Sequence, residues 1–254
     1  MDGQYLLELR HITKSFGGVR ALQGVSVAVG FREVLAIVGD NGAGKSTLMK
    51  IASGALAPDD GETWLEGRPI VIRNPRHAAA LGIQMVYQDL ALVDCLDVVT
   101  NLYLGREHCW RFCGIDVLRR RDMEENTKRH LKQLGVDLPD VRTAVRNLSG
   151  GQRQVTAISR AVFWGTKLVI MDEPTAALGV RESGTVNQLI RSLPQQDLSV
   201  IVISHNLEHV FHIADRVVVL RQGKKVGERL IKETCPEEVV RMITGAEPPT
   251  EDAA

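Results

Sequence analysis

The sequence has no excess of either charge and no long apolar run. Lys plus Arg and Asp plus Glu both number 31 in 254 residues, so the formal net charge is zero. This balance gives no reason to expect attraction to a nucleic-acid backbone. The longest apolar runs, such as RVVVLR and KLVIM, are strand-sized and too short to cross a bilayer. The first segment, MDGQYLLELR, contains acids and lacks the apolar core of a secretory signal, so we expect a cytosolic protein.

Cysteine is also scarce, at four residues. Four cysteines in a chain of this length do not suggest a disulfide framework. Cys109 and Cys113 flank WRF beside His108, which would give three candidate ligands for a metal. Because this spacing matches no established zinc pattern, ordinary reduced thiols are the better interpretation.

The chain is long enough for one large domain, or for one core with an inserted lobe, and 44% of its residues are hydrophobic. Short apolar, β-branched segments alternate with segments of helical character. We predict strands at 33–39, 62–70, 83–88, 167–174 and 199–206, a hairpin at 214–228 that turns at Gln222–Gly223, and helices at 45–56, 151–164 and 180–193. This alternation predicts an α/β fold with a mainly parallel sheet covered on both faces.

Residues 89–148 have a different pattern and read as a helical lobe inserted into the sheet domain. Helices are predicted at 96–105 and 116–135, and in the second Met123, Thr127, Leu131 and Leu134 recur at helical spacing. The last ten residues, GAEPPTEDAA, have the composition of a disordered tail.

A phosphate-binding loop follows the first predicted strand. The segment GDNGAGKST fits G-x-x-x-x-G-K-[ST] with Gly39, Gly44, Lys45 and Ser46. Its glycines let backbone N–H groups turn toward a phosphate chain, and the following helix directs its positive dipole end there. Lys45 would supply charge to the outer phosphates, and the Ser46 hydroxyl can bind Mg²⁺. An ordinary glycine-rich turn is the alternative, which the strand before the loop and the helix after it disfavour.

Two acids end the predicted strand LVIMD. In a protein with such a loop, Asp172 would hold Mg²⁺ directly or through water. Alternation along a strand would point Glu173 the other way, where it could polarise a water that attacks a phosphate. The competing interpretation is a pair of solvated acids, which four preceding apolar residues disfavour.

A second anion site is predicted at LSGGQ, which comprises Leu148, Ser149, Gly150, Gly151 and Gln152. Ser149 is a plausible N-cap, and the glycines leave backbone N–H groups uncovered at a helix N-terminus. One nucleotide does not need two helix N-termini of a single chain on opposite sides of its phosphates. A second copy of the protein could supply the other one.

The order of the motifs GDNGAGKST, VYQD, LSGGQ, LVIMDEPT and VISHN resembles the nucleotide-binding subunit of an ATP-binding cassette (ABC) transporter, over roughly residues 5–230. KSFGGVRAL and EPTAALGVRES narrow the resemblance to the ATPases of bacterial monosaccharide importers of the ribose, fructose and xylose type. The resemblance implies one ABC ATPase domain with a P-loop NTPase fold: an α/β core at 1–88 and 149–230 with an antiparallel β subdomain, and a helical signature subdomain at 89–148. A C-terminal helix and the tail would occupy 231–254.

The resemblance also assigns roles by position. Phe16 would stack on adenine, with a core phenylalanine as the alternative. Gln88 would reach Mg²⁺ and the attacking water, and His205 would contact the γ-phosphate. The implied sets are catalytic Glu173, His205, Lys45 and Gln88; ATP-binding Phe16, Gly39, Asp40, Asn41, Gly42, Ala43, Gly44, Lys45, Ser46 and Thr47; and magnesium-binding Ser46, Gln88 and Asp172.

The implied assembly is a head-to-tail dimer with two ATP molecules between the copies, in which residues 148–152 act in trans. Its partners would be integral membrane permease subunits and, indirectly, a sugar-binding protein, with no nucleic acid. Residues 89–105 are expected to contact the permease. The expected location is peripheral, on the cytoplasmic face of the inner or plasma membrane. The transported solute cannot be deduced, because the ATPase does not touch it.

Three alternatives remain open. HNLEH at 205–209 fits the H-x-x-E-H pattern of a zinc peptidase family. However, His205 is predicted to end a strand, so only His209 would lie on the helix. His209, His11 and His77 are otherwise ordinary surface or hydrogen-bonded histidines. A non-transport ABC ATPase would need a coiled coil or tandem cassettes, and an ATP-holding regulatory module would need a lost catalytic residue.

Gly179 replaces an acid common in the family and is expected to alter communication between two sites.

Overall fold

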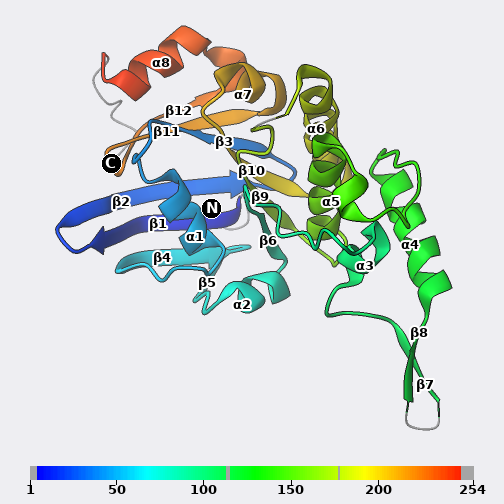
Figure 1. The fold of residues 1–254 in the computed structure, drawn as a ribbon. Helices are drawn as coiled ribbons and strands as arrows, with labels where there is room; N and C mark the ends of the chain where they lie inside the picture. Colours follow the sequence, from blue (N-terminus) through cyan, green and yellow to red (C-terminus); the bar gives the residue numbers. More distant parts are fainter. Residues whose placement is uncertain (1–4, 113–114, 177, 247–254) are drawn as a thin grey trace.

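The computed structural model describes residues 5–112, 115–176 and 178–246, which form two main sheets and the helices around them (Figure 1). The larger sheet has six strands in the order β12-β11-β3-β10-β9-β6. All of its pairs are parallel except β11 with β12. Its strands are β3 Val34–Val38, β6 Ile83–Val86, β9 Leu168–Asp172, β10 Ser199–Ile203, β11 Arg216–Arg221 and β12 Lys224–Leu230.

This sheet is buried on both faces, as the near-continuous apolar strands predict. In β10, Ile201 and Ile203 pack toward the antiparallel sheet, whereas Val200 and Val202 pack toward the helices on the other side. Ile203 pairs with Asp172, so the carboxyl ends of β9 and β10 lie at the same edge. Ligand sites of parallel sheets form at this edge.

A second, antiparallel sheet has the strand order β2-β1-β4-β5 and lies beside the first (Figure 1). Its strands are β1 Tyr5–Phe16, β2 Val19–Gly30, β4 Asp60–Leu65 and β5 Arg68–Ile70. The strand predicted at 62–70 is therefore two strands that turn at residues 66–67. The expected fold class, a mainly parallel core with an antiparallel β part, is confirmed.

Buried charged groups join the two sheets. Arg216 at the start of β11 donates from Nε to Glu33 Oε1 at 2.7 Å and from Nη2 to the Ala28 carbonyl at 2.8 Å. Arg216 also forms an ion pair with Glu228 of β12. Because the Arg216 and Glu33 side chains are only 12% and 15% exposed, this network is screened little by solvent.

The predicted helices are present, mostly with shorter ends, whereas the helix at Pro75–Ala80 was not predicted. The described α-helices are α1 Lys45–Ala52, α2 Pro75–Ala80, α3 Val98–Tyr103, α4 Arg120–Gln133, α5 Gly150–Val162, α6 Val180–Ser192, α7 Leu207–Ile213 and α8 Pro236–Thr244. Short 3₁₀ turns occupy Val145–Asn147, Leu193–Gln196 and Ile231–Glu233. The hairpin predicted at 214–228 is confirmed, and its turn residues Gln222 and Gly223 have φ angles of 48° and 78°, as a type I′ turn requires.

The segment 89–148 differs from the prediction in one respect. It contains α3 and α4, but also a protruding hairpin of β7 Cys109–Phe112 and β8 Ile115–Leu118 (Figure 1). The helix predicted at 116–135 was therefore wrong over its first residues and begins at Arg120. The periodic positions Met123, Thr127, Leu131 and Leu134 all lie after that point and are buried. Val117 instead pairs with Trp110 across the hairpin, where β-branched and aromatic residues favour strand pairing.

Within the described residues, none of the helices is both long and apolar enough to span a membrane. Of the segment predicted to be a tail, residues 247–254 lie outside the described residues.

Candidate nucleotide site

The predicted phosphate loop connects β3 to α1. Gly44, at the N-cap of α1, has a φ of 102°, a left-handed conformation that favours glycine. A Cβ at this position would also lie 2.7 Å from the Ala21 carbonyl oxygen of β2 and 2.8 Å from Leu22 Cδ2. No side chain caps α1. Its first N–H groups therefore remain available for an anion at the positive end of the helix.

Lys45 is the first residue of α1 and is folded back over the loop. Its Nζ donates to the carbonyl oxygens of Gly39 at 2.7 Å and Asp40 at 3.0 Å. The residue is only 8% exposed. Burial lowers the pKa of Lys45, while the charges of Glu173, Asp172 and Asp40 act in the opposite direction. Three nearby acids thus favour the ammonium in a site that solvates it poorly.

Asp172 ends β9 beside the start of α1. Burial raises the pKa of this carboxyl, and the charge of Glu173 raises it further, whereas a hydrogen bond from Ser46 and the charge of Lys45 lower it. A carboxylate and a hydroxyl therefore lie within contact of one another. Such hard oxygen donors suit Mg²⁺, so the residues present fit the ion that the sequence predicts.

Glu173 faces the residue after the neighbouring strand. Its Oε1 accepts from the backbone N–H of His205 at 3.1 Å and lies 2.7 Å from His205 Nδ1. The prediction that Asp172 and Glu173 point differently was based on strand alternation. Strand alternation does not extend to Glu173, because β9 has ended at Asp172 and Glu173 has a left-handed φ of 51°. That conformation is uncommon for a residue other than glycine and occurs at functional sites.

A cavity of about 440 Å³ is lined both by residues of the phosphate loop and by three of the predicted catalytic residues. Its lining includes Gly39, Asp40, Asn41, Gln88, Glu173, Ala176 and His205. Ile243 from the last turn of α8 also lines it, which the sequence analysis did not anticipate. Gln88 follows β6, Glu173 follows β9 and His205 follows β10, so three neighbouring strand ends supply these three side chains. Of the catalytic set, Lys45 stands outside this lining, with its ammonium bonded to the loop carbonyls.

Phe16 and the LSGGQ residues are not part of that lining. Phe16 ends β1 and is 50% exposed, which excludes the alternative of a core phenylalanine. Ser149 is the N-cap of α5, as predicted, with a capping box to Gln152. The Ser149 N–H donates to Gln152 Oε1 at 2.9 Å, and the Gln152 N–H donates to Ser149 Oγ at 3.3 Å. Residues 148–152 therefore form a capped helix N-terminus that is not part of the lining of the cavity beside the phosphate loop.

Glu182, in the first turn of α6, covers this helix N-terminus, a contact that no local sequence pattern predicts. A Cβ on Gly151 would lie 2.8 Å from Glu182 Cβ, so only glycine fits without a shift. Hydrogen bonds from the Ser149 hydroxyl and the Gly151 N–H lower the pKa of Glu182. The prediction that these N–H groups are uncovered is thus wrong for Gly151 in this state of the chain.

The structure does not match the zinc-peptidase alternative, whereas the Cys109–Cys113 alternative is not tested. The segment α7 begins at Leu207, so His205 lies before the helix that carries His209, as expected. His209 hydrogen-bonds to Thr175 at 2.6 Å, and His77 Nδ1 accepts from the Arg73 N–H at 3.4 Å. The described part of the chain contains no group of three or more His, Cys, Asp or Glu residues placed to hold a metal. Cys113 lies outside the described residues.

Comparison with known proteins agrees with this geometry. The sequence pattern described as ABC transporter matches residues 22–176. The chain is 44% identical over 239 residues to the xylose/arabinose import ATP-binding protein of Sulfolobus acidocaldarius, covering 94% of both chains. It is 43% identical over 259 residues to the fructose import ATP-binding protein of Rhizobium meliloti, covering 100% of this chain and 99% of that one. A ribose import ATP-binding protein of Rubrobacter xylanophilus is 44% identical, and 94% of this chain matches 47% of that longer relative.

Solved structures give the same result. The crystal structure of an ATP-binding cassette of an ABC transporter in its ADP conformation has a TM-score of 0.78 and 25% sequence identity, covering 94% of this chain and 95% of that one. The expected resemblance is therefore confirmed in both sequence and fold. The chain belongs to the ABC transporter family and is one of its ATP-hydrolysing cassettes.

Proposed function

We propose that this protein powers import of a monosaccharide through a membrane permease, by closing as a dimer on ATP and opening after hydrolysis. The observation that carries the hydrolytic part is the single cavity beside the phosphate loop that Gln88, Glu173 and His205 all line. The sugar is suggested by the relatives, whose names describe import of xylose, arabinose, fructose or ribose.

The phosphate loop would bind the β- and γ-phosphates of ATP. The N–H groups at the start of α1 lack a side-chain cap, and oriented N–H groups at a helix N-terminus stabilise anions. Lys45 would exchange its bonds to the Gly39 and Asp40 carbonyls for phosphate oxygens. This exchange replaces neutral carbonyl partners by anionic ones around an ammonium whose pKa burial has lowered, so bound phosphate would favour the protonated form. Phe16, exposed at the end of β1, would stack on the base.

Glu173 would orient and polarise the attacking water. Its carboxylate is held by two contacts to His205, and at 17% side-chain exposure it is sheltered from solvent. His205 is itself 70% exposed and can turn toward a γ-phosphate. Mg²⁺, bound by Ser46, Asp172 and Gln88, would neutralise charge on the β- and γ-phosphates.

A second copy would complete the site. Ser149, Gly150 and Gly151 form a helix N-terminus that the phosphate loop of the same chain does not meet. In a head-to-tail dimer these residues would contact the γ-phosphate held by the opposing copy. ATP would then be part of the interface, so its binding favours the closed dimer and its hydrolysis releases it.

The segment 89–105 would dock permease subunits on the cytoplasmic face of the membrane. Gln88 immediately precedes it and lines the nucleotide cavity, so occupancy of the γ-phosphate site can be transmitted to this surface. Tyr87, just before this segment, and Leu104, near its end, are 38% and 49% exposed. Specificity for the sugar would lie in the permease and in a separate sugar-binding protein.

Replacement of Glu173 by Gln tests the proposal. In the assembled transporter we expect Glu173→Gln to bind ATP normally but to hydrolyse it at about one hundredth of the normal rate or less, because general-base catalysis contributes roughly this factor. Steady-state phosphate release and equilibrium ATP binding give the two readouts. Glu125→Gln, an exposed position on α4, is the matched control and should keep the normal rate. Near-normal hydrolysis by Glu173→Gln would refute the assignment of Glu173.

A further inference from the structure

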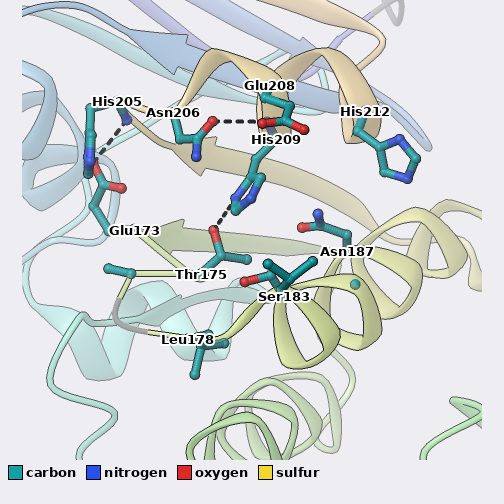
Figure 2. A pocket seen from close by; sticks show the side chains of 13 residues that line it. Glu173, Thr175, Leu178, Ser183, Asn187, His205, Asn206, Glu208, His209 and His212 are labelled. Carbon is teal, nitrogen blue, oxygen red and sulfur yellow. Dashed lines mark hydrogen bonds and ion pairs between the residues drawn. The ribbon is translucent and has the colours of Figure 1, made fainter.

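A second cavity lies directly behind Glu173 and His205. It has a volume of about 570 Å³ and shares Glu173, Ala176 and His205 with the cavity beside the phosphate loop. Its other walls are the loop after β9, the first half of α6 and the exposed side of α7 (Figure 2). The Glu173 and His205 side chains therefore border open space on this side rather than packed atoms.

Because open space lies beside the loop between β9 and α6, hydrogen bonds rather than packing must hold its conformation. It begins at Glu173 in a left-handed conformation, which is retained only where the surroundings hold it. The backbone contributes local bonds, from the Ala176 N–H to the Glu173 carbonyl at 3.1 Å and from the Glu173 N–H to the Ile203 carbonyl at 3.0 Å. These bonds anchor the start of the loop, but do not reach across the cavity.

A side-chain hydrogen bond does cross it. Thr175 Oγ1 lies 2.6 Å from His209 Nδ1, and Figure 2 shows the two side chains pointing toward one another over the open space. His209 is itself fixed, because its backbone N–H donates to Asn206 Oδ1 at 3.3 Å in the cap of α7. The loop after β9 is thus joined to the segment after β10 at two successive points, Glu173 to His205 and Thr175 to His209.

We propose that His209 is a positioning residue for ATP hydrolysis. Through Thr175 it holds the loop after β9, and with it the Glu173 carboxylate, in the conformation from which Glu173 polarises the attacking water. This inference rests on the proposed role of Glu173. A hydroxyl can either donate or accept, so the bond forms with neutral or protonated imidazole.

The test measures ATP hydrolysis and ATP affinity of the full chain in the assembled transporter. We expect His209→Ala to lower kcat roughly ten-fold and to leave the KM for ATP within about two-fold, because a displaced catalytic group costs rate without removing substrate contacts. His209→Asn offers a carboxamide oxygen near the position of Nδ1 and should recover most of the rate. A variant that merely destabilised the fold would not be rescued in this way.

The partner residue supplies an independent arm. Thr175→Val removes the hydroxyl at nearly constant volume and should lower kcat as much as His209→Ala does, whereas Thr175→Ser should retain it. The double variant Thr175→Val/His209→Ala should be no slower than either single variant, because both remove one bond. Multiplied losses in the double variant would overturn the proposal, as would a rate for His209→Ala within about two-fold of normal.

His212→Ala is the matched control. His212 lines the same cavity one turn further along α7, and its side chain forms no hydrogen bond with the side chain or backbone of another described residue. The variant should hydrolyse ATP at the normal rate, and equal loss in both histidine variants would refute a specific role for His209. Glu173→Gln measured in parallel separates the two proposals, since a normal rate there refutes the role of Glu173 and not the Thr175–His209 contact.

Discussion

At the scale of single residues, the nucleotide site contains two groups whose charged forms are disfavoured by their burial on folding. Burial lowers the pKa of Lys45 and raises the pKa of Asp172. Each residue partly stabilises the other, but neither is as well solvated as in the unfolded chain. Such groups remain in place because a ligand uses them, and they are expected to reduce the stability of the nucleotide-free protein.

Asp172→Asn tests this cost. The pKa of Asp172 is raised from its ordinary value of 3.8, so the folded chain binds more protons than the unfolded chain above about pH 4. The stability that protonated Asp172 contributes is complete below the ordinary value and is lost as the pH rises through the raised pKa. We expect Asp172→Asn to melt a few degrees higher than the normal chain at pH 7 without nucleotide or Mg²⁺, and the difference to shrink toward pH 4.

The same variant should lose Mg²⁺-dependent hydrolysis by roughly 100-fold or more, because the carboxylate that would hold the ion is gone. Thermal melting in a chelator and phosphate release in excess Mg²⁺ give the two readouts. A variant with native secondary structure that melts lower at pH 7 would contradict the electrostatic argument.

Sequence reasoning proposed the residues that would react but missed the contacts that support them. The roles of Lys45 and Glu173 were predicted from local motifs, and that of His205 from the family resemblance. The Thr175–His209 bond joins residues 34 positions apart, and Ile243 reaches the nucleotide cavity from α8. Neither contact has a local pattern, because each depends on how distant elements pack. His209 could be predicted only as a hydrogen-bonded histidine, without its partner.

At the scale of secondary-structure elements, Gly179 is the N-cap of α6. Its φ and ψ of −69° and 164° are open to any residue, and a Cβ there would meet no atom within 4 Å. The backbone conformation therefore does not require glycine at this position. We expect the missing carboxylate to be what affects communication between the two ATP sites.

Gly179→Asp should fit without strain. We expect a gain of a few tenths of a kcal/mol in folding stability from capping of α6, and a larger change in the cooperativity of hydrolysis with ATP concentration than in the rate at a single site. Gly184→Ala, in the interior of α6 with open space around it, is the control that stabilises the same helix without adding a carboxylate. Hydrolysis that appears only in Gly179→Asp would instead identify the normal chain as an ATP-holding module.

Element boundaries show why part of the fold escaped prediction. The apolar period of α4 is clear from Met123 onward, and there the helix was predicted correctly. Residues 115–118 have no such period, and they form β8 only because β7 lies opposite them. A hairpin of this kind is specified by cross-strand pairs rather than by a pattern within one segment.

At the scale of the whole molecule, the proposed dimer implies that one copy carries two half-sites. The phosphate loop and the Ser149 helix N-terminus belong to the same chain, yet the cavity beside the loop includes none of residues 148–152 in its lining. A head-to-tail dimer would join each half-site to its complement, and this predicts complementation between variants.

Mixed copies of Lys45→Ala and Ser149→Arg test that arrangement. Each variant alone should be inactive, because every site in its dimer lacks one half. A one-to-one mixture should regain up to about a quarter of the normal rate, since half of the dimers are mixed and each mixed dimer holds one intact site. Phosphate release from purified, mixed chains in the assembled transporter is the measurement. Mixed dimers that form but remain as inactive as their parents would contradict action in trans.

The bonds of Arg216 have a mechanical consequence for the complete transporter. Arg216 joins the six-stranded sheet to Glu33 and to the Ala28 carbonyl of the antiparallel sheet, so these two sheets should turn as one stiff body. Any movement that ATP drives would then have to occur elsewhere, for example at the exposed residues 87–89, where β6 leads into the segment 89–148. The helical segment 89–148, and not the antiparallel sheet, would accordingly be the part that moves relative to the six-stranded sheet.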